Sequence, residues 1–138
     1  MTAERVRPGG ASGVLASRQR GEPMTVTIYH NPRCSKSRET LALLQQKGIQ
    51  PKVIEYLKTP PDAKTLDRFL KQLRMEPRDL MRRKEAPYAA LKLDNPKLTR
   101  ERLVAAMVEN PILIERPIVV ADGKVALGRP PEAVLKIL

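Results

Sequence analysis

The chain changes between two hydrophobic periods, and the first change falls around its sole cysteine. Residues 25–29 place aliphatic side chains on one side and Thr or Tyr on the other, the two-residue alternation of a β-strand. From Ser35 onward leucines recur at helical spacing until Gly48, a typical helix stop. The pattern therefore predicts a strand and then a helix, joined by a loop that contains Cys34.

Three further segments carry strand patterns: residues 52–57, 118–120 and 124–127. A strand, a helix and a second strand in succession predict a right-handed parallel crossover. Asp122-Gly123 is the strongest hairpin signal in the chain and predicts an antiparallel pair. We therefore expect an α/β fold with a four-stranded mixed sheet and flanking helices. The Cys34 loop then lies at the carboxyl end of the first strand, a usual ligand position in such sheets.

The middle of the chain is predicted to be helical. An apolar stripe follows the second strand, formed by Leu66, Phe69, Leu70 and Leu73. Prolines then divide the chain into short helical pieces, at positions 77, 87, 96 and 111. The side chains expected to point inward from these pieces are Leu80, Leu91, Leu103 and Met107. A last short helix is expected to start at residues 129–131.

Length and composition are those of a single domain. A chain of 138 residues buries roughly two-thirds of its unfolded surface. Residues 1–23 lack any sustained period, which predicts a disordered extension before a domain at 24–138. Because no apolar run approaches the roughly 18 residues of a membrane span, we expect no membrane partner. A single cysteine suits a reducing compartment, and we expect the protein to be cytoplasmic.

A net charge of +11 indicates anionic partners. The first 23 residues hold four arginines and two glutamates, so most of that charge belongs to the rest of the chain. The few aromatic residues are scattered and not interleaved with the basic ones, which argues against a nucleic-acid partner. We expect part of the charge to bind a small oxyanion. His30 and Cys34 alone cannot complete a metal site, so no metal is predicted.

Cys34 lies where a loop enters a helix, beside unpaired backbone N–H groups and the positive end of the helix dipole. Four side chains close in sequence are cationic or can become so: His30, Arg33, Lys36 and Arg38. This setting predicts a thiol whose pKa lies below about 8.5. The Ser37 hydroxyl could donate a hydrogen bond to the sulfur across one helical turn. Free cysteines usually pack as small hydrophobes, but these polar neighbours favour a reactive thiol.

Four motifs occur in order, and together they resemble one family. They are His30-Asn31-Pro32-Arg33-Cys34, Arg82 five residues before Pro87-Tyr88, residues 110–120 around Arg116-Pro117, and Gly128-Arg129-Pro130. Over residues 24–138 the chain resembles the glutaredoxin-linked arsenate reductase (ArsC) family. The resemblance implies a thioredoxin-like fold with a helical insertion between its two halves, and a cis bond before Pro117.

The resemblance also implies roles for individual residues. Cys34 matches the catalytic thiol of the family. Three arginines match those that hold the oxyanion and its intermediates: Arg82, Arg116 and Arg129. The surroundings of the thiol are matched by His30, Asn31, Ser37 and Arg38. Because Arg83 directly follows Arg82, either of them could be the first site arginine. Each of the arginines could instead form an ordinary surface ion pair.

The activity implied is reduction of arsenate, or a similar oxyanion, to arsenite through a cysteine–arsenic intermediate. Because the chain has no second cysteine, an external thiol must complete the reduction. The resemblance implies glutathione as co-substrate and glutaredoxin as partner, with no tightly bound cofactor. Two alternatives stay open: a glutathione-dependent thiol oxidoreductase of unknown substrate, and a redox-sensing transcription regulator that binds RNA polymerase. Ser37 in place of a second cysteine, together with Arg129, favours the enzyme over the regulator.

Overall fold

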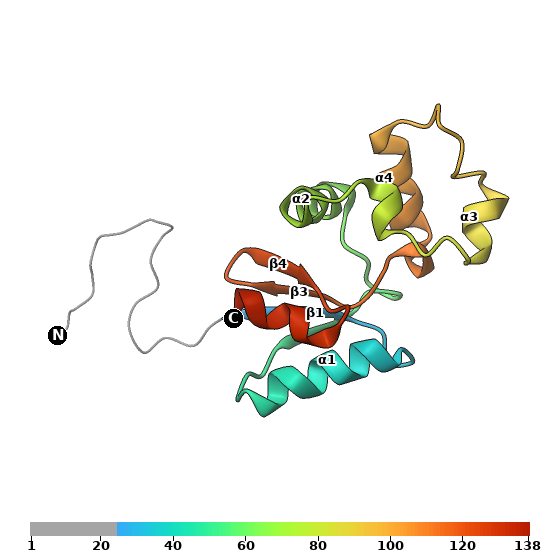
Figure 1. Ribbon diagram of the computed structural model, residues 1–138. Coiled ribbons are helices and arrows are strands. Elements are labelled where there is room, and N and C mark those ends of the chain that lie inside the picture. Colours follow the sequence, from blue (N-terminus) through green and yellow to red (C-terminus); the bar gives the residue numbers. More distant parts are fainter. Residues whose placement is uncertain (1–24) are drawn as a thin grey trace, which may run out of the picture.

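The computed structural model describes residues 25–138, so the extension predicted over residues 1–23 lies outside the described part. The strands are β1 (Val26–His30), β2 (Lys52–Glu55), β3 (Ile118–Ala121) and β4 (Lys124–Leu127). They form one four-stranded sheet in the order β2-β1-β3-β4 (Figure 1). β1 pairs with β2 in parallel and with β3 in antiparallel, so the predicted mixed sheet is confirmed.

The pairing registers show which strand ends lie next to one another in the sheet. Tyr29 of β1 lies opposite Ile118 of β3, so β3 begins where β1 is about to end. β3 and β4 form the predicted hairpin, in which Asp122 and Gly123 both have positive φ, 50° and 84°. Such values at both central positions suit a two-residue type I′ turn, which explains the Asp-Gly sequence there. The carboxyl end of β1 therefore meets the chain that enters β3.

One face of the sheet is covered by α1 (Ser35–Gln46) and by the 3₁₀ helix η3 (Pro131–Ile137), as Figure 1 shows. Alternate residues of β1 and β3 point to this face, as the two-residue period predicted. They form a compact core with one residue each of α1, β4 and η3: Val26, Ile28, Leu44, Val119, Ala121, Ala126 and Val134. This core fixes α1, and with it the loop that precedes α1.

The first helix of the helical insertion lies over the other face, and the rest of the insertion extends beyond the sheet (Figure 1). The elements of the insertion are α2 (Ala63–Leu73), η1 (Pro77–Leu80), α3 (Ala86–Ala90), α4 (Arg100–Glu109) and η2 (Pro111–Leu113). The Phe69 ring packs edge-on against Tyr29 of β1, with ring centroids 5.4 Å apart. The inward position predicted for Leu91 was wrong: it is 39% exposed, whereas Leu93 is 1% exposed. α3 ends at Ala90, and the turn that follows directs Leu93 inward instead.

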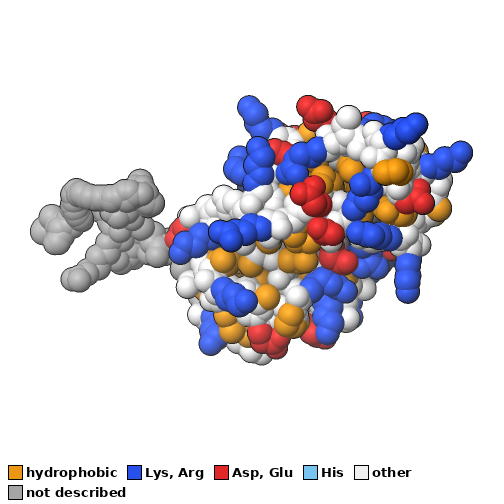
Figure 2. Space-filling view, turned by 45° about the horizontal axis from the view of Figure 1, so that its top comes forward, with side chains coloured by type: hydrophobic (Ala, Val, Ile, Leu, Met, Phe, Trp, Pro, Cys, Tyr) orange, Lys and Arg blue, Asp and Glu red, His pale blue; other side chains and the backbone are white. Residues whose placement is uncertain are grey.

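Basic side chains are dispersed over the surface. On the face shown in Figure 2, Lys and Arg side chains are spread across the domain with acidic side chains among them. That dispersal resembles an ordinary solvated surface more than a continuous basic track. Within residues 25–138, no helix combines the length and apolar character needed to cross a membrane.

Candidate active site

The loop between β1 and α1 is held by Asn31. The side-chain oxygen of Asn31 accepts a hydrogen bond from the Arg33 N–H at 3.0 Å, and its backbone carbonyl accepts from the Cys34 N–H at 3.0 Å. Asn31 is buried and anchors the turn to the domain, whereas Pro32 and Arg33 at its tip are exposed. Cys34 is the N-cap residue of α1 and is partly exposed. The loop thus presents the thiol at the positive end of the helix.

The pKa of the Cys34 thiol lies below its ordinary value. Partial burial is the largest influence and raises the pKa, but it is outweighed by the backbone N–H groups of Ser37 and Lys36 and by the Arg116 guanidinium. Hydrogen bonds and a nearby cation both favour the charged form of a thiol. The direction supports the predicted thiolate. The side-chain cation that acts on it is Arg116, which is distant in sequence.

The Ser37 hydroxyl has a different role from the one predicted. Its oxygen lies 2.6 Å from His30 Nδ1 and accepts a hydrogen bond from the Asn31 N–H at 3.0 Å. A hydroxyl bond from Ser37 to the Cys34 sulfur was therefore a wrong prediction. In the first turn of a helix the side chain leans back toward the preceding segment, here the end of β1. Ser37 acts on the sulfur through its backbone N–H.

His30 and Arg38 hold the loop through hydrogen bonds to Ser37 and to the Pro32 carbonyl. His30 is buried, and burial lowers its pKa; Glu55 opposes this shift and Arg38 adds to it. Arg38 Nη1 donates a hydrogen bond to the Pro32 carbonyl at 3.0 Å. The neutral imidazole is therefore favoured in the folded protein. The hydrogen bonds of these two residues stabilise the turn.

Arg116 enters the site directly before β3. Its Nε and Nη1 atoms are buried and have no hydrogen-bond partner among residues 25–138. The bond between Arg116 and Pro117 is cis, as the resemblance implied, and the bond between Arg129 and Pro130 is cis as well. A Cβ atom on Gly128 would lie 2.7 Å from Pro117 Cγ. The approach of these two loops therefore requires a glycine.

Arg82 and Arg129 meet at Glu115. Arg82 Nη1 lies 3.1 Å and Arg129 Nε lies 3.4 Å from the same carboxylate oxygen, Glu115 Oε1. Arg129 also donates to the Arg116 carbonyl at 3.1 Å, which joins this pair to the thiol side of the site. Arg83 instead donates to the carbonyl of Arg78 and pairs with Asp79. The structure thus assembles the three predicted arginines around residues 115–116 and favours Arg82 over Arg83.

Two residues at the site were missed by the sequence analysis, Glu115 and Tyr56. Tyr56 is fully buried, and burial raises its pKa against the opposing influence of Arg116 and of a hydrogen bond from Asn31. It directly follows β2, whose carboxyl end lies at the same edge of the sheet as that of β1. This parallel arrangement was a signal that could have revealed Tyr56. Nothing in the residue pattern distinguishes Glu115 from a surface carboxylate.

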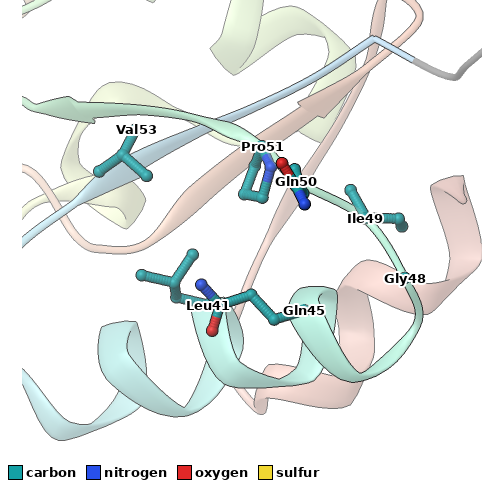
Figure 3. A pocket seen from close by; sticks show the side chains of 7 residues that line it. All are labelled: Leu41, Gln45, Gly48, Ile49, Gln50, Pro51 and Val53. Atoms are coloured by element: carbon teal, nitrogen blue, oxygen red, sulfur yellow. The ribbon is translucent and has the colours of Figure 1, made fainter.

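The cavities of the domain differ in how well they suit an anion. Figure 3 shows a hollow of about 390 Å³ between the second half of α1 and residues 48–53, lined by Leu41, Gln45 and Val53 among others. It has no charged lining and lies at the end of α1 remote from Cys34. A second cavity of about 370 Å³ adjoins the reactive loop, and its lining includes two basic residues, Arg33 and Lys58, and one acidic residue, Glu55. Among residues 25–138 there is no cluster of His, Cys, Asp or Glu that could hold a metal.

Comparison with known proteins agrees with this geometry. The model of the ArsC family matches residues 29–137. The protein YfgD of Escherichia coli is 59% identical over 114 residues, covering 82% of this chain and 96% of YfgD. An arsenate reductase of Haemophilus influenzae is 50% identical over 116 residues, covering 83% of this chain and all of that protein (100%). The structure of an arsenate reductase from Vibrio cholerae superposes with a TM-score of 0.81 at 55% identity, covering 85% and 100%. The chain therefore belongs to the ArsC family, and its fold is thioredoxin-like.

Proposed function

We propose that this protein is an oxidoreductase that reduces arsenate to arsenite. One observation carries the proposal: the Arg116 guanidinium acts on the Cys34 sulfur while two of its own nitrogen atoms are buried without a partner among the described residues. A guanidinium offers forked N–H donors that suit a tetrahedral oxyanion. The relatives named arsenate reductases support the identity of that anion.

In the first step, arsenate binds beside Cys34 and accepts hydrogen bonds from Arg116. The thiolate then attacks arsenic and forms a sulfur–arsenic bond, and one oxygen of the substrate leaves as water after it is protonated. This is nucleophilic covalent catalysis by an activated thiol. The lowered pKa of Cys34 supplies the thiolate near neutral pH.

The second step needs an external thiol, because Cys34 is the sole cysteine of the chain. A glutathione thiolate attacks the Cys34 sulfur, and the electron pair of the sulfur–arsenic bond passes to arsenic. Arsenic is thereby reduced by two electrons and leaves as arsenite, while the two thiols are oxidised to a mixed disulfide. Glutaredoxin then reduces this disulfide by thiol–disulfide exchange and restores Cys34.

A coupled assay tests the proposal. Arsenate-dependent oxidation of NADPH is followed with glutathione, glutaredoxin and glutathione reductase present. We expect turnover by the wild type and none above background for Cys34→Ser. The exposed neighbour Ser35 supplies a matched control, since Ser35→Ala should retain the wild-type rate. An unchanged rate in Cys34→Ser would refute the mechanism.

A second candidate is a glutathione-dependent thiol oxidoreductase. The observation that favours it is Glu115, which already binds Arg82 and Arg129 and leaves Arg116 to serve the thiol. Such an enzyme would reduce a glutathione mixed disulfide by attack of the Cys34 thiolate. Reduction of hydroxyethyl disulfide by glutathione, measured beside the arsenate assay, separates the two. Turnover of the disulfide with none of arsenate would favour the second candidate.

A further inference from the structure

Glu115 places one carboxylate oxygen between two arginines of the candidate site. A single oxygen, Oε1, lies 3.1 Å from Arg82 Nη1 and 3.4 Å from Arg129 Nε. The exposed fraction of the side chain is 22% for Glu115, 26% for Arg82 and 34% for Arg129. Solvent and salt therefore screen these charges less than they screen fully exposed charges. An oxygen shared between two guanidinium groups is the arrangement that arginines offer to oxyanions.

Both arginines would stay in position without Glu115. Arg82 uses a different nitrogen, Nε, to bind Glu85 at 3.2 Å. Arg129 uses Nη1 to donate to the Arg116 carbonyl at 3.1 Å. The N–H groups that now face Glu115 are therefore available to another acceptor without movement of either arginine. This second set of contacts makes an exchange of acceptors feasible.

The exchange would discriminate between anions. Glu115 belongs to the chain, so its carboxylate occupies the arginines without the entropy cost that a free ligand meets on association. A free carboxylate has the same charge and the same acceptor atoms as Glu115 and gains nothing by replacing it. A tetrahedral oxyanion with two charges offers stronger attraction to the arginines, and Arg116, the residue after Glu115, adds a third positive charge to the site. It can displace Glu115 where a monoanion cannot.

We infer that Glu115 is a specificity-determining residue, which holds the place of the oxyanion in the free protein and admits only multiply charged tetrahedral anions to all three arginines. The inference rests on the proposed oxyanion site. Glu115 then competes with the substrate for Arg82 and Arg129, a role that the family resemblance did not imply. Arsenate would accordingly bind more weakly than three arginines alone would allow.

Binding of inorganic sulfate tests this inference without any redox step. Its dissociation constant is obtained from the protection of Cys34 against alkylation at fixed pH and ionic strength. In Glu115→Gln we expect affinity for sulfate to rise about tenfold, since the competing charge is lost while Arg82 and Arg129 remain anchored. Acetate, which should not protect the wild type, should protect this variant.

Two other variants serve as controls. Glu85→Gln removes a carboxylate that binds Arg82 alone, so a rise smaller than that of Glu115→Gln is expected. Glu109→Gln removes the same charge at the end of α4, where Glu109 binds Arg102, and should leave sulfate affinity unchanged. If Glu115→Gln does not fold, Glu115→Asp draws the carboxylate back by one methylene and should still raise the affinity.

An unchanged or lower affinity for sulfate in the Glu115 variants would overturn the inference, since Glu115 would then only position the arginines. The outcome does not depend on arsenate reduction. Tighter binding of sulfate in Glu115→Gln, with no reduction of arsenate by any variant, would uphold the role of Glu115 and refute the proposed function.

Discussion

His30 Nδ1 lies 2.6 Å from the hydroxyl oxygen of Ser37, and this buried contact joins the end of β1 to the first turn of α1. The same hydroxyl accepts the Asn31 N–H at 3.0 Å. The His30 ring, the Asn31 N–H and the Ser37 hydroxyl, all buried, thus find hydrogen-bond partners through one oxygen atom next to the loop that carries Cys34. The position of the thiol therefore depends on the Ser37 hydroxyl, although the partners of that hydroxyl are His30 and Asn31.

Ser37→Ala should therefore destabilise the protein. The substitution leaves the buried Asn31 N–H and His30 ring without their common partner, which costs about 1–3 kcal/mol. Urea unfolding measures the change in the free energy of unfolding. Ser35→Ala, at an exposed position two residues away, should change it by less than about 0.5 kcal/mol. Equal stabilities of the two variants would contradict the role assigned to the Ser37 hydroxyl.

Stability should depend on pH through His30, the only histidine of the chain. Burial lowers its pKa in the folded protein, so the unfolded chain binds a proton there more readily. The free energy of unfolding should therefore fall as the pH drops below about 6.5, and it should be level above that value.

Urea titrations between pH 5 and pH 7.5, roughly the range in which a histidine changes charge, measure this slope. His30→Gln should flatten it, because carboxyl groups titrate mainly below this range. A slope of equal size in His30→Gln would show that another group is responsible.

The rate of Cys34 alkylation should rise with pH around a midpoint below the value of about 8.5 typical of a free thiol. Arg116→Gln should move that midpoint upward, because the loss of the cation disfavours the thiolate. Arg102→Gln, which removes a cation that binds Glu109 on α4, should leave the midpoint where it is. Coinciding midpoints in the wild type and Arg116→Gln would contradict the assigned activation.

Gly128→Ala should lower both stability and activity. The added Cβ would lie 2.7 Å from Pro117 Cγ and from Thr40 Oγ1, so the loop of Arg116 must shift. Overpacking of this kind costs about 1–3 kcal/mol.

Gly48→Ala provides a comparison at the far end of α1. There a Cβ meets no atom within 4 Å, but φ is +80°. We expect a loss of stability of about 1 kcal/mol from the backbone alone, with the rate retained. Full activity of Gly128→Ala would show that the close approach does not position Arg116.

The strands and the thiol were predictable because their signals are local. Val26 and Ile28 alternate within one strand, and Cys34 lies beside a helix start that its own neighbours define. The partner of the Ser37 hydroxyl was not predictable, because the direction of that side chain depends on where β1 ends in space. The pairing of Glu115 with Arg82 was equally hidden, since it joins residues 33 positions apart through tertiary packing.

The pairing of strands β1 and β3 sets the distance between the Cys34 sulfur and the Arg116 guanidinium. Cys34 follows β1, Arg116 precedes β3, and the antiparallel register sets Tyr29 against Ile118. A slip by one residue would move Arg116 by roughly 3.3 Å and turn Val119 from one core to the other. A mutation in the apolar core that disturbs this register should therefore also change the reactivity of the Cys34 thiol, even where the mutated residue lies far from the sulfur.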